Sequence, residues 1–390
     1  MLMCVYSCTI NQTLKLMKQG EIVQKEFHVK IPFEYRLGLI VLKVNIKGKE
    51  HHFILDTGAP NVISKELAEE LNLLKAFDTK AGDSQGNNEK LGFAVVDELE
   101  IGGVVFKNTG AAIADLTKSK EVGCLNVEGF IGANLMRKAI WQFNFEDQTI
   151  TITNDRFSLS MGGDYYFSIP FIQKVTGTPM INVLLGDVRD NNVTVDFGSN
   201  GGYKSSKTTF LALQKELSSY LRGYGSASAG LYGGNPDTSF VAKVPSFQIG
   251  NITNNDQVID FSDKGEKSIG LLYFKNYEVT IDWFKEEIVL IQHEEHEGLQ
   301  LKGFGFSPAF KDDKVYIGFL MNVPDIINSG LAIGDQIIAF DGTDCSNVNE
   351  NELCGVMEKF REKVTNDQIN LKVRNQKGEV KNVSLSKVHL

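Results

Sequence analysis

An internal repeat constrains the fold of this chain more than any other feature of its sequence. Residues 40–58 and residues 180–198 each read as an apolar strand, a polar turn and a second strand. Each second strand ends in Asp-x-Gly, at Asp56 in the first copy and at Asp196 in the second. One strand–turn–strand unit has therefore been used twice.

The repeat continues downstream in the same order. Ile131-Gly132 in the first copy corresponds to Ile269-Gly270 in the second, and each pair precedes another apolar segment. Gly132 follows Asp56 by 76 positions and Gly270 follows Asp196 by 74. Matching elements at nearly equal spacing predict two homologous β-rich lobes, residues 22–158 and 163–292.

Composition supports this mostly β prediction and excludes several functions. The chain has 37 Gly and 8 Pro residues among many Val, Ile and Phe, which suits short strands joined by tight turns. A net charge of -9 without a basic run argues against nucleic-acid binding. No stretch of about 18 apolar residues is present to span a membrane. No Gly-rich loop leads into Lys-Ser or Lys-Thr, so phosphate chemistry is not indicated.

The cysteines and histidines do not form a recognisable metal site. The five cysteines (Cys4, Cys8, Cys124, Cys345 and Cys354) form no CxxC pair and are expected to be buried or free thiols. His293 and His296 have no third ligand nearby, so the charged segment around them is interpreted as a linker. No metal and no cofactor is predicted.

Residues 1–21 form a separate N-terminal segment in this interpretation. The first eight residues are apolar but too few, and lack the positive start, for a signal peptide. Val5-Tyr6-Ser7-Cys8 resembles the end of a lipoprotein signal whose front is missing. The expected location is the periplasm or a lipoprotein anchor if the N-terminus is truncated, and the cytoplasm otherwise.

The repeated aspartates indicate a specific chemistry. A carboxylate beside apolar residues is costly to bury unless it is satisfied, and neither copy supplies a cation at an equivalent position. Two lobes related by a pseudo-two-fold axis would bring Asp56 and Asp196 together on that axis. Such a pair shares one proton: the ionised member activates a water and the protonated member polarises a carbonyl.

These residues carry a family resemblance. Phe53-Ile54-Leu55-Asp56-Thr57-Gly58-Ala59 resembles the active-site motif of retropepsin-like and pepsin-like aspartic proteases, and the two Ile-Gly pairs resemble the hydrophobic-hydrophobic-Gly motif of that family. The resemblance covers about residues 30–292 and occurs twice. It implies a bilobal single-chain peptidase, of the bacterial type, that acts on a polypeptide substrate without a cofactor. A monomer is expected.

The second motif departs from the family, since Phe197 stands where Thr or Ser is expected. In the family that hydroxyl helps to brace the two catalytic loops, so the resemblance implies a one-sided brace made by Thr57 alone. Ser199 is positioned for its hydroxyl to bond the carboxylate of Asp196. The residues expected to support the loops are Thr57, Gly58, Ala59, Gly198 and Ser199.

Each lobe also contains a Gly-rich candidate for a flap that closes over the substrate. Both candidates lie between the Asp-x-Gly loop and the Ile-Gly pair, where the family keeps its flap. Small residues suit a mobile hairpin whose backbone pairs with an extended peptide. The candidate flap residues are Ser84, Gln85 and Gly86 in the first lobe and Gly225 and Ser226 in the second.

Residues 299–390 resemble a PDZ domain. Gly303-Phe304-Gly305-Phe306 resembles the carboxylate-binding loop of that family, and residues 329–337 match its internal Gly-Leu-x-x-Gly-Asp-x-Ile signature. Residues 349–361 read as the helix beside the peptide groove. The resemblance implies that loop N–H groups hold a terminal carboxylate while a peptide adds to a strand edge.

Three hypotheses follow for the whole chain. The first is an aspartic endopeptidase whose PDZ domain binds peptide or protein termini. The second is a catalytically weak or inactive peptide-binding relative, with Phe197 as the sign of lost activity. The third is a carbohydrate-acting enzyme with paired carboxylates, which the repeat disfavours because glycosidase carboxylates need not lie on duplicated loops.

Overall fold

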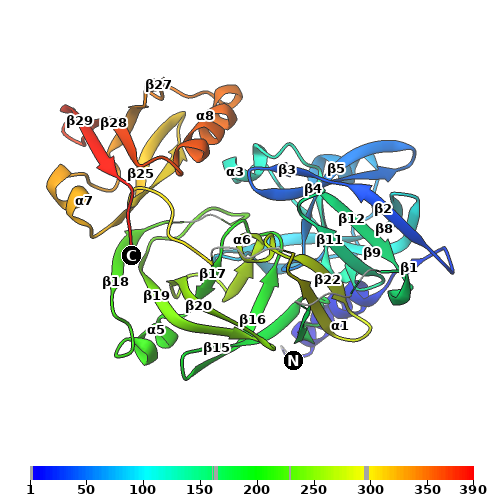
Figure 1. Cartoon of the computed structure of the whole chain (residues 1–390). Coiled ribbons are helices and arrows are strands. Elements are labelled where there is room, and N and C mark those ends of the chain that lie inside the picture. Colours follow the sequence, from blue (N-terminus) through cyan, green and yellow to red (C-terminus); the bar gives the residue numbers. More distant parts are fainter. Residues whose placement is uncertain (1–2, 160, 162–165, 228–229, 294–297) are drawn as a thin grey trace.

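The computed structural model describes residues 3–159, 161, 166–227, 230–293 and 298–390, with the side chains of 3–10 and 350–351 excepted. Strands predominate over helices throughout this part of the chain, so the prediction of a mostly β protein is confirmed. The described strands form three sheets, and Figure 1 colours their strands by position in the chain.

The first sheet, from residues 21–132, has the strand order β1-β9-β6-β10-β5-β4-β8-β7, with β3 paired to β4. Its strands are β1 (Glu21–Ile22), β3 (Glu34–Arg36), β4 (Leu39–Ile46), β5 (Lys49–Asp56), β6 (Val62–Ser64), β7 (Phe77–Gly82), β8 (Asn88–Ile101), β9 (Val104–Ala114) and β10 (Gly129–Gly132). Short helices α2 (Lys65–Glu70), α3 (Lys120–Gly123) and α4 (Ala133–Met136) connect them.

The second half of the repeat, residues 172–274, builds a sheet of the same plan. Its strands are β14 (Ile172–Gln173), β15 (Pro179–Leu185), β16 (Val188–Asp196), β17 (Tyr203–Ser205), β18 (Tyr220–Gly225), β19 (Asp237–Ile249), β20 (Ile252–Phe261) and β21 (Ser268–Gly270), with helices α5 (Lys207–Leu213) and α6 (Leu271–Phe274). In both halves the Asp-x-Gly strand pairs in parallel with the Ile-Gly strand, β5 with β10 and β16 with β21.

Local capping repeats as well. Ser64 caps α2 by accepting from the N–H of Leu67, and Ser206 caps α5 by accepting from the N–H of Thr209. The two short helices α4 and α6 each begin directly after the Gly of the Ile-Gly pair. The halves thus share their order of strands, caps and helices around the two aspartates.

A six-stranded antiparallel sheet joins the halves, in the order β13-β23-β22-β11-β12-β2. Its strands are β2 (His28–Pro32), β11 (Ile140–Asn144), β12 (Thr149–Thr153), β13 (Tyr166–Pro170), β22 (Glu278–Asp282) and β23 (Glu287–Ile291), and a short 3₁₀ turn η1 (Arg156–Ser158) follows β12. At its centre Trp141 of β11 is paired with Ile281 of β22, and both side chains are buried. The main apolar core therefore continues from one half into the other.

The C-terminal region has an apolar core of its own, built from buried residues between Phe304 and Val388. It contains β24 (Phe306–Lys311), β25 (Lys314–Met321), α7 (Pro324–Ser329), β26 (Gln336–Phe340), β27 (Thr343–Asp344), α8 (Glu350–Lys363), β28 (Gln368–Arg374) and β29 (Val380–Ser386). Figure 1 shows it in orange and red as a body beside the two halves. Its β25 pairs with β18 of the second half, which links the two sheets into one.

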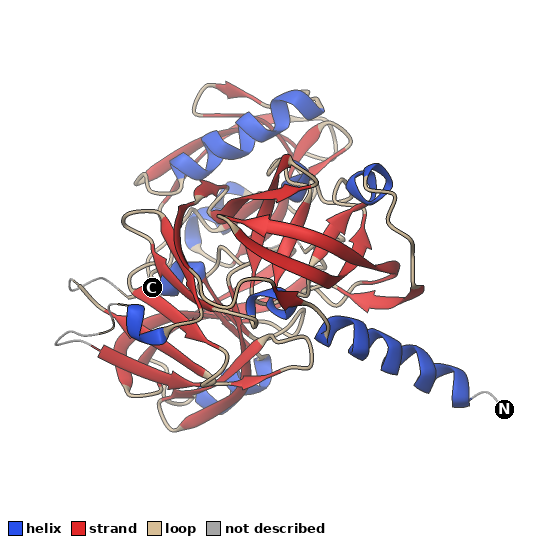
Figure 2. Cartoon of the chain, turned by 90° about the vertical axis from the view of Figure 1, so that its right-hand side faces the viewer, coloured by secondary structure: helices blue, strands red, loops and turns tan. Residues whose placement is uncertain are grey.

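The N-terminal segment forms helix α1 (Met3–Lys18), which extends away from the strands toward the N-terminus in Figure 2. Among its described side chains, residues 11–18, those of Leu16 and Met17 in the last turn are buried and join the apolar cluster of the first sheet. Within the described residues no helix has both the length and the apolar character needed to cross a membrane.

The expectation of free thiols is wrong for two cysteines. Cys124, just after α3, and Cys354, in α8, form a disulfide across a sequence separation of 230 residues. Cys345 is a buried free thiol, as expected. The side chains of Cys4 and Cys8, and His296, lie outside the described residues. The disulfide was missed because nothing in the sequence brings α3 close to α8, whereas the folded chain ties the C-terminal region to both halves.

The disulfide yields the first prediction. A Cys124→Ser/Cys354→Ser double variant is expected to lose about 2–4 kcal/mol of unfolding free energy, because the cross-link restricts the unfolded chain. Urea unfolding followed by hydrogen exchange would measure this, with faster exchange expected in α8. Reductant should lower the stability of the wild type to that of the variant and leave the variant unchanged. A wild-type chain that binds thiol reagents at both cysteines without reduction would contradict the bond.

Candidate active site

The two repeated aspartates lie at the carboxyl ends of equivalent strands, Asp56 at the end of β5 and Asp196 at the end of β16. Their side chains meet and hydrogen-bond to one another. A Cβ atom built on Gly58 would lie 2.7 Å from Oδ1 of Asp196, and one on Gly198 would lie 2.4 Å from Cγ of Asp56. Each glycine is therefore required so that the opposite carboxylate can approach its loop.

Backbone N–H groups hold the two carboxylates unequally. Oδ1 of Asp56 accepts from the N–H of Gly58 at 2.8 Å and of Ala59 at 3.0 Å. Oδ1 of Asp196 accepts from the N–H of Gly198 at 3.0 Å. Because hydrogen bonds from N–H groups favour the ionised form, Asp56 is the better stabilised carboxylate.

The expected bond from the Ser199 hydroxyl to Asp196 is not among the hydrogen bonds of the described residues. Instead, Oγ of Ser199 accepts from the N–H of Gly201 at 3.3 Å, and the N–H of Ser199 donates to the backbone oxygen of Asp196 at 3.2 Å. The hydroxyl is thus used within its own turn, which a sequence position alone does not reveal.

The pKa values of both aspartates are raised, chiefly by burial. The shift is larger for Asp196, where the charge of Asp56 adds to burial and the hydrogen bond with Asp56 favours the protonated form. At Asp56 the N–H groups of Gly58 and Ala59 and the hydrogen bond with Asp196 oppose the rise in pKa. These influences favour the proton on Asp196 and the negative charge on Asp56.

Thr57 connects the two loops beneath the carboxylates. Its buried hydroxyl donates to the carbonyl oxygen of Val195 at 2.7 Å and accepts from the N–H of Phe197 at 2.9 Å. Phe197 has no hydroxyl to return these bonds, so the connection runs in one direction only. Both partners of Thr57 are backbone groups of the second loop, so they are present whichever side chain stands at position 197.

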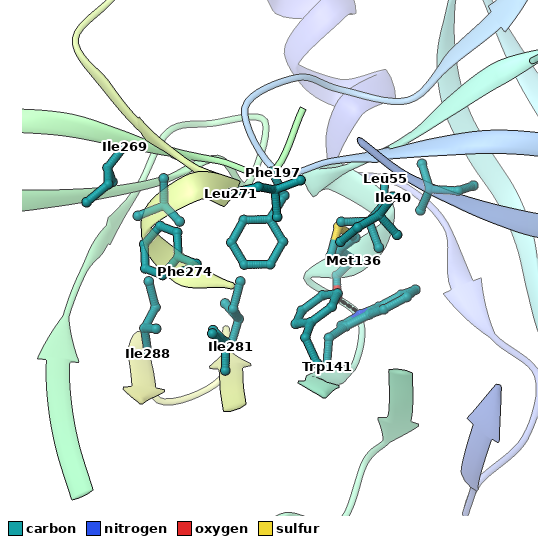
Figure 3. Packing of buried hydrophobic residues seen from close by; sticks show 14 of the residues in the cluster. Ile40, Leu55, Met136, Trp141, Phe197, Ile269, Leu271, Phe274, Ile281 and Ile288 are labelled. Carbon is teal, nitrogen blue, oxygen red and sulfur yellow. Dashed lines mark hydrogen bonds between the residues drawn. The ribbon is translucent and has the colours of Figure 1, made fainter. Parts of the chain in front are cut away.

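The ring of Phe197 fills the core below the loop, as Figure 3 shows. It is fully buried and contacts Phe143 and Phe274, with ring centroids 4.9 Å and 5.4 Å away. These partners come from β11 and α6, one from each half. The residue that breaks the sequence motif therefore packs against both halves on the side away from solvent.

The glycines of the Ile-Gly pairs support the loops from behind. A Cβ atom on Gly132 would lie 2.1 Å from the carbonyl carbon of Pro60, and one on Gly270 would lie 2.6 Å from the carbonyl oxygen of Gly201. The first half adds a buried amide network, in which Asn61 accepts from the N–H of Gly132 and donates its own N–H to Asn134. Sequence reasoning missed both asparagines, because the second copy has no matching pair.

The first flap candidate, Ser84, Gln85 and Gly86, forms the turn between β7 and β8. The carboxylate of Asp83 holds this turn by accepting from the N–H groups of Gln85 and Asn87.

The same turn is also tied to the second half. Asp83 accepts from the N–H of Tyr232 at 3.0 Å, and the carbonyl oxygen of Ser84 accepts from the N–H of Glu266 at 3.3 Å. The turn therefore reaches across from one half to the other. The contact of Asp83, part of the flap segment 82–86 expected from the sequence, with Tyr232 was not predicted, because it depends on how the halves meet.

The second flap candidate has a different environment. Gly225 lies in β18 beside Phe319 of β25, and the N–H of Ser226 donates to the carbonyl oxygen of Gly318 at 2.9 Å. These backbone groups are paired with the C-terminal region in this structure.

The loop predicted to bind carboxylates, residues 303–306, leads into β24. The ring of Phe304 is buried, and Gly303 and Gly305 have φ angles of 109° and 79°, which favour glycine. β24 pairs with β25 along one edge and has no second partner among the described strands. The helix α8 lies close to β24, where Phe306 and Phe360 meet with centroids 5.5 Å apart.

Replacing the hydroxyl of Thr57 gives a second prediction. Thr57→Val keeps the side-chain shape but leaves the backbone groups of Val195 and Phe197 without their partner, so we expect a loss of about 1–3 kcal/mol in unfolding free energy. Urea unfolding would measure it. Thr57→Ser is the matched control and should keep most of the stability. Equal stability of the Val and Ser variants would contradict the bracing role.

Comparison with known proteins agrees with the first half of this site. A search of curated proteins finds no match. A family model described as aspartyl protease matches residues 42–135, a segment that includes Asp56, Thr57 and Gly132. The first of the two aspartate loops, with its Ile-Gly partner, is thus similar to the aspartyl protease family.

Proposed function

We propose that the chain is an aspartic endopeptidase with Asp56 and Asp196 as its catalytic pair. The observation that carries the proposal is the contact of the two carboxylates, each lying against the glycine of the opposite loop. The match of residues 42–135 to aspartyl proteases supports a hydrolase that acts on peptide bonds. In this proposal residues 22–158 and 163–292 are the two lobes of one peptidase.

The unequal environments of the carboxylates suggest their roles. Ionised Asp56 accepts a proton from a water as the water attacks the substrate carbonyl, and protonated Asp196 donates a hydrogen bond to the carbonyl oxygen. Thr57, Gly58, Ala59, Gly198 and Ser199 shape the loops. Ser84, Gln85 and Gly86 cover the substrate from the first lobe. Gly225 and Ser226 belong to the second flap, which their backbone pairing with β25 holds in place.

The competing hypothesis is an inactive peptide-binding relative. Phe197 motivated that hypothesis, but its ring packs into the core and leaves both carboxylates in contact. The hydroxyl that Phe197 lacks would brace the two loops. Thr57 makes two hydrogen bonds to the second loop in the absence of that hydroxyl. The arrangement therefore favours an active pair over a degenerate one.

A third prediction tests catalysis. Asp56→Asn and Asp196→Asn are each expected to lower the rate of cleavage of a diverse peptide library by about 10²–10⁴-fold, because each removes one member of the acid–base pair. Mass spectrometry of the cleaved library would measure this. Asp187→Asn, at an exposed turn, is the matched control. Cleavage that neither the Asp56→Asn nor the Asp196→Asn variant slows would contradict the assignment of these two residues as the catalytic pair.

The same assay has a pH dependence. The raised pKa of Asp196 keeps the shared proton bound above the usual range of a carboxyl group. Activity is expected to fall as pH rises through that raised pKa, because the pair loses its proton, and to fall at low pH when Asp56 is protonated too. The rate of library cleavage across this range would show both limbs.

We further propose that residues 299–390 act as a PDZ domain that binds the free C-terminus of a peptide. The unpaired edge of β24, the turn at Gly303 and Gly305, and α8 beside it support this proposal. An extended peptide would add to β24 as a strand, with its carboxylate at the N–H groups of residues 303–306. This binding would bring substrates to the peptidase or orient them.

A fourth prediction concerns this groove. In the full-length Asp56→Asn variant, peptides with a free C-terminus are expected to bind and to slow hydrogen exchange in β24. The same peptides with amidated C-termini are the matched controls and should bind weakly, since they lack the charge that the loop N–H groups favour. Equal binding of both forms, or protection confined to other strands, would contradict the proposal.

A further inference from the structure

The flap turn of the first half is hydrogen-bonded to residues 230–235 of the second half. Side-chain amides, a carboxylate and backbone groups take part in these bonds. The bonds run from the N–H of Tyr232 to Asp83 at 3.0 Å, from Nδ2 of Asn235 to the carbonyl oxygen of Gln85 at 3.1 Å and to Oδ1 of Asn87 at 2.8 Å, and from Nδ2 of Asn87 to the carbonyl oxygen of Gly233 at 3.3 Å. We call this set of contacts the clasp.

The segment that makes the clasp contains a tight turn. Gly230 and Gly233 exchange backbone hydrogen bonds of 3.0 Å and 3.2 Å, so Leu231 and Tyr232 stand at the tip of a two-residue turn. Turn tips usually carry Gly, Pro, Asn, Asp or Ser. Two large apolar side chains at such a tip indicate that the tip packs against another part of the protein.

That other part is the face of the first sheet that carries Asp56. One face of this sheet joins the main core, through side chains such as Leu55. The opposite face forms a separate apolar cluster that includes Ile54. Asp56 lies two positions after Ile54 on β5, so its side chain points to this second face. Leu231 and Tyr232 pack against the cluster on this face and are themselves half-buried.

The flap turn also reaches a loop close to Asp196. The carbonyl oxygen of Ser84 accepts from the N–H of Glu266 at 3.3 Å. Burial raises the pKa of Asp196 most, and after Asp56 the charge of Glu266 adds to the rise. Glu266 is therefore within electrostatic range of the carboxylate pair. The turn thus extends from the sheet that carries one aspartate to a loop near the other.

The hydroxyl of Tyr232 indicates that the closed arrangement carries a cost. This hydroxyl is buried and has no hydrogen-bond partner among the described residues. Its ring lies 5.8 Å from Nζ of Lys118 by its centroid, a contact that does not satisfy the hydroxyl. A buried hydroxyl without a partner is destabilising, and the penalty is removed when the group reaches water. Opening of the clasp would therefore relieve an unfavourable contact.

We propose that the clasp is an autoinhibitory contact, which holds the flap turn closed across the two halves until a peptide displaces residues 230–235. This inference rests on the proposed peptidase function and describes the regulation of that site. In the closed form Leu231 and Tyr232 cover part of the apolar face beside Asp56. In the open form that face is free for the side chains of a substrate.

Two substitutions should change the clasp in opposite directions. Asn235→Ala removes the hydrogen bonds to Gln85 and Asn87, so it favours the open form. Tyr232→Phe removes the hydroxyl that has no partner and keeps the ring, so it favours the closed form. Neither substitution touches the carboxylate pair or its loops.

Peptide binding to the full-length Asp56→Asn variant would measure both effects. The probe is a fluorescein-labelled pool of random peptides with amidated C-termini, which the proposed groove at β24 binds weakly, titrated by fluorescence anisotropy. Added Asn235→Ala is expected to tighten binding about 3- to 30-fold and added Tyr232→Phe to weaken it about 3- to 10-fold, because the closed form must open before a peptide binds.

Hydrogen exchange would locate these effects. Residues 83–87 should exchange faster with Asn235→Ala and more slowly with Tyr232→Phe. Asn255→Ala, at an exposed position of β20, is the matched control and should change neither binding nor exchange. Leu231→Ser is a second variant that favours the open form, and Leu211→Ser, at a position 65% exposed, is its control.

Weaker binding by the Asn235→Ala and Leu231→Ser variants would overturn the proposal, because residues 230–235 would then be a fixed wall of the binding site. Binding that stays the same in the Asn235→Ala and Tyr232→Phe variants would also overturn it.

The two levels of inference fail differently. Opposite changes in peptide binding, with no cleavage by any variant that keeps Asp56, would contradict the peptidase and support the clasp. Cleavage that depends on Asp56 but proceeds at equal rates in the wild type and in the Asn235→Ala and Tyr232→Phe variants would support the peptidase and overturn the clasp.

Discussion

The contact between the carboxylates of Asp56 and Asp196 is the constraint on which most of the structure depends. Two like charges are costly to bring together in a partly buried site, so the pair needs a shared proton and N–H donors. It also needs close approach, which Gly58 and Gly198 allow because neither has a Cβ atom. The six-stranded sheet then holds the two halves at the distance that this contact requires, with Trp141 and Ile281 buried at its centre.

Phe197 shows how such a site tolerates a change in its motif. Thr57 reaches backbone groups in the opposite loop, and those groups are present whatever side chain follows Asp196. The Phe ring adds apolar contacts with residues from both halves, which favour the same arrangement of the halves by burial instead of hydrogen bonding. The hydrogen bonds of Thr57 and the packing of Phe197 thus both hold the two aspartate loops in position.

The C-terminal region is joined to the two halves by different means. β25 extends the sheet of the second half through β18, and the disulfide of Cys124 with Cys354 reaches the first half. Helix α8, which carries Cys354, also lies beside the open edge of β24.

The sequence by itself determined the mostly β character, the duplicated strand ends at Asp56 and Asp196 and the distances along the chain to their Ile-Gly partners. These are local or periodic features, since alternation and turn residues are set by neighbours in the chain. The family match of residues 42–135 agrees with the first motif. Only the tertiary structure decided which groups meet across long separations, as in the disulfide and the contact of Asp83 with Tyr232, and only it showed that the Ser199 hydroxyl bonds within its own turn. The physical reason is that a side chain's surroundings depend on the strands and loops that come to lie beside it and not on its neighbours in sequence.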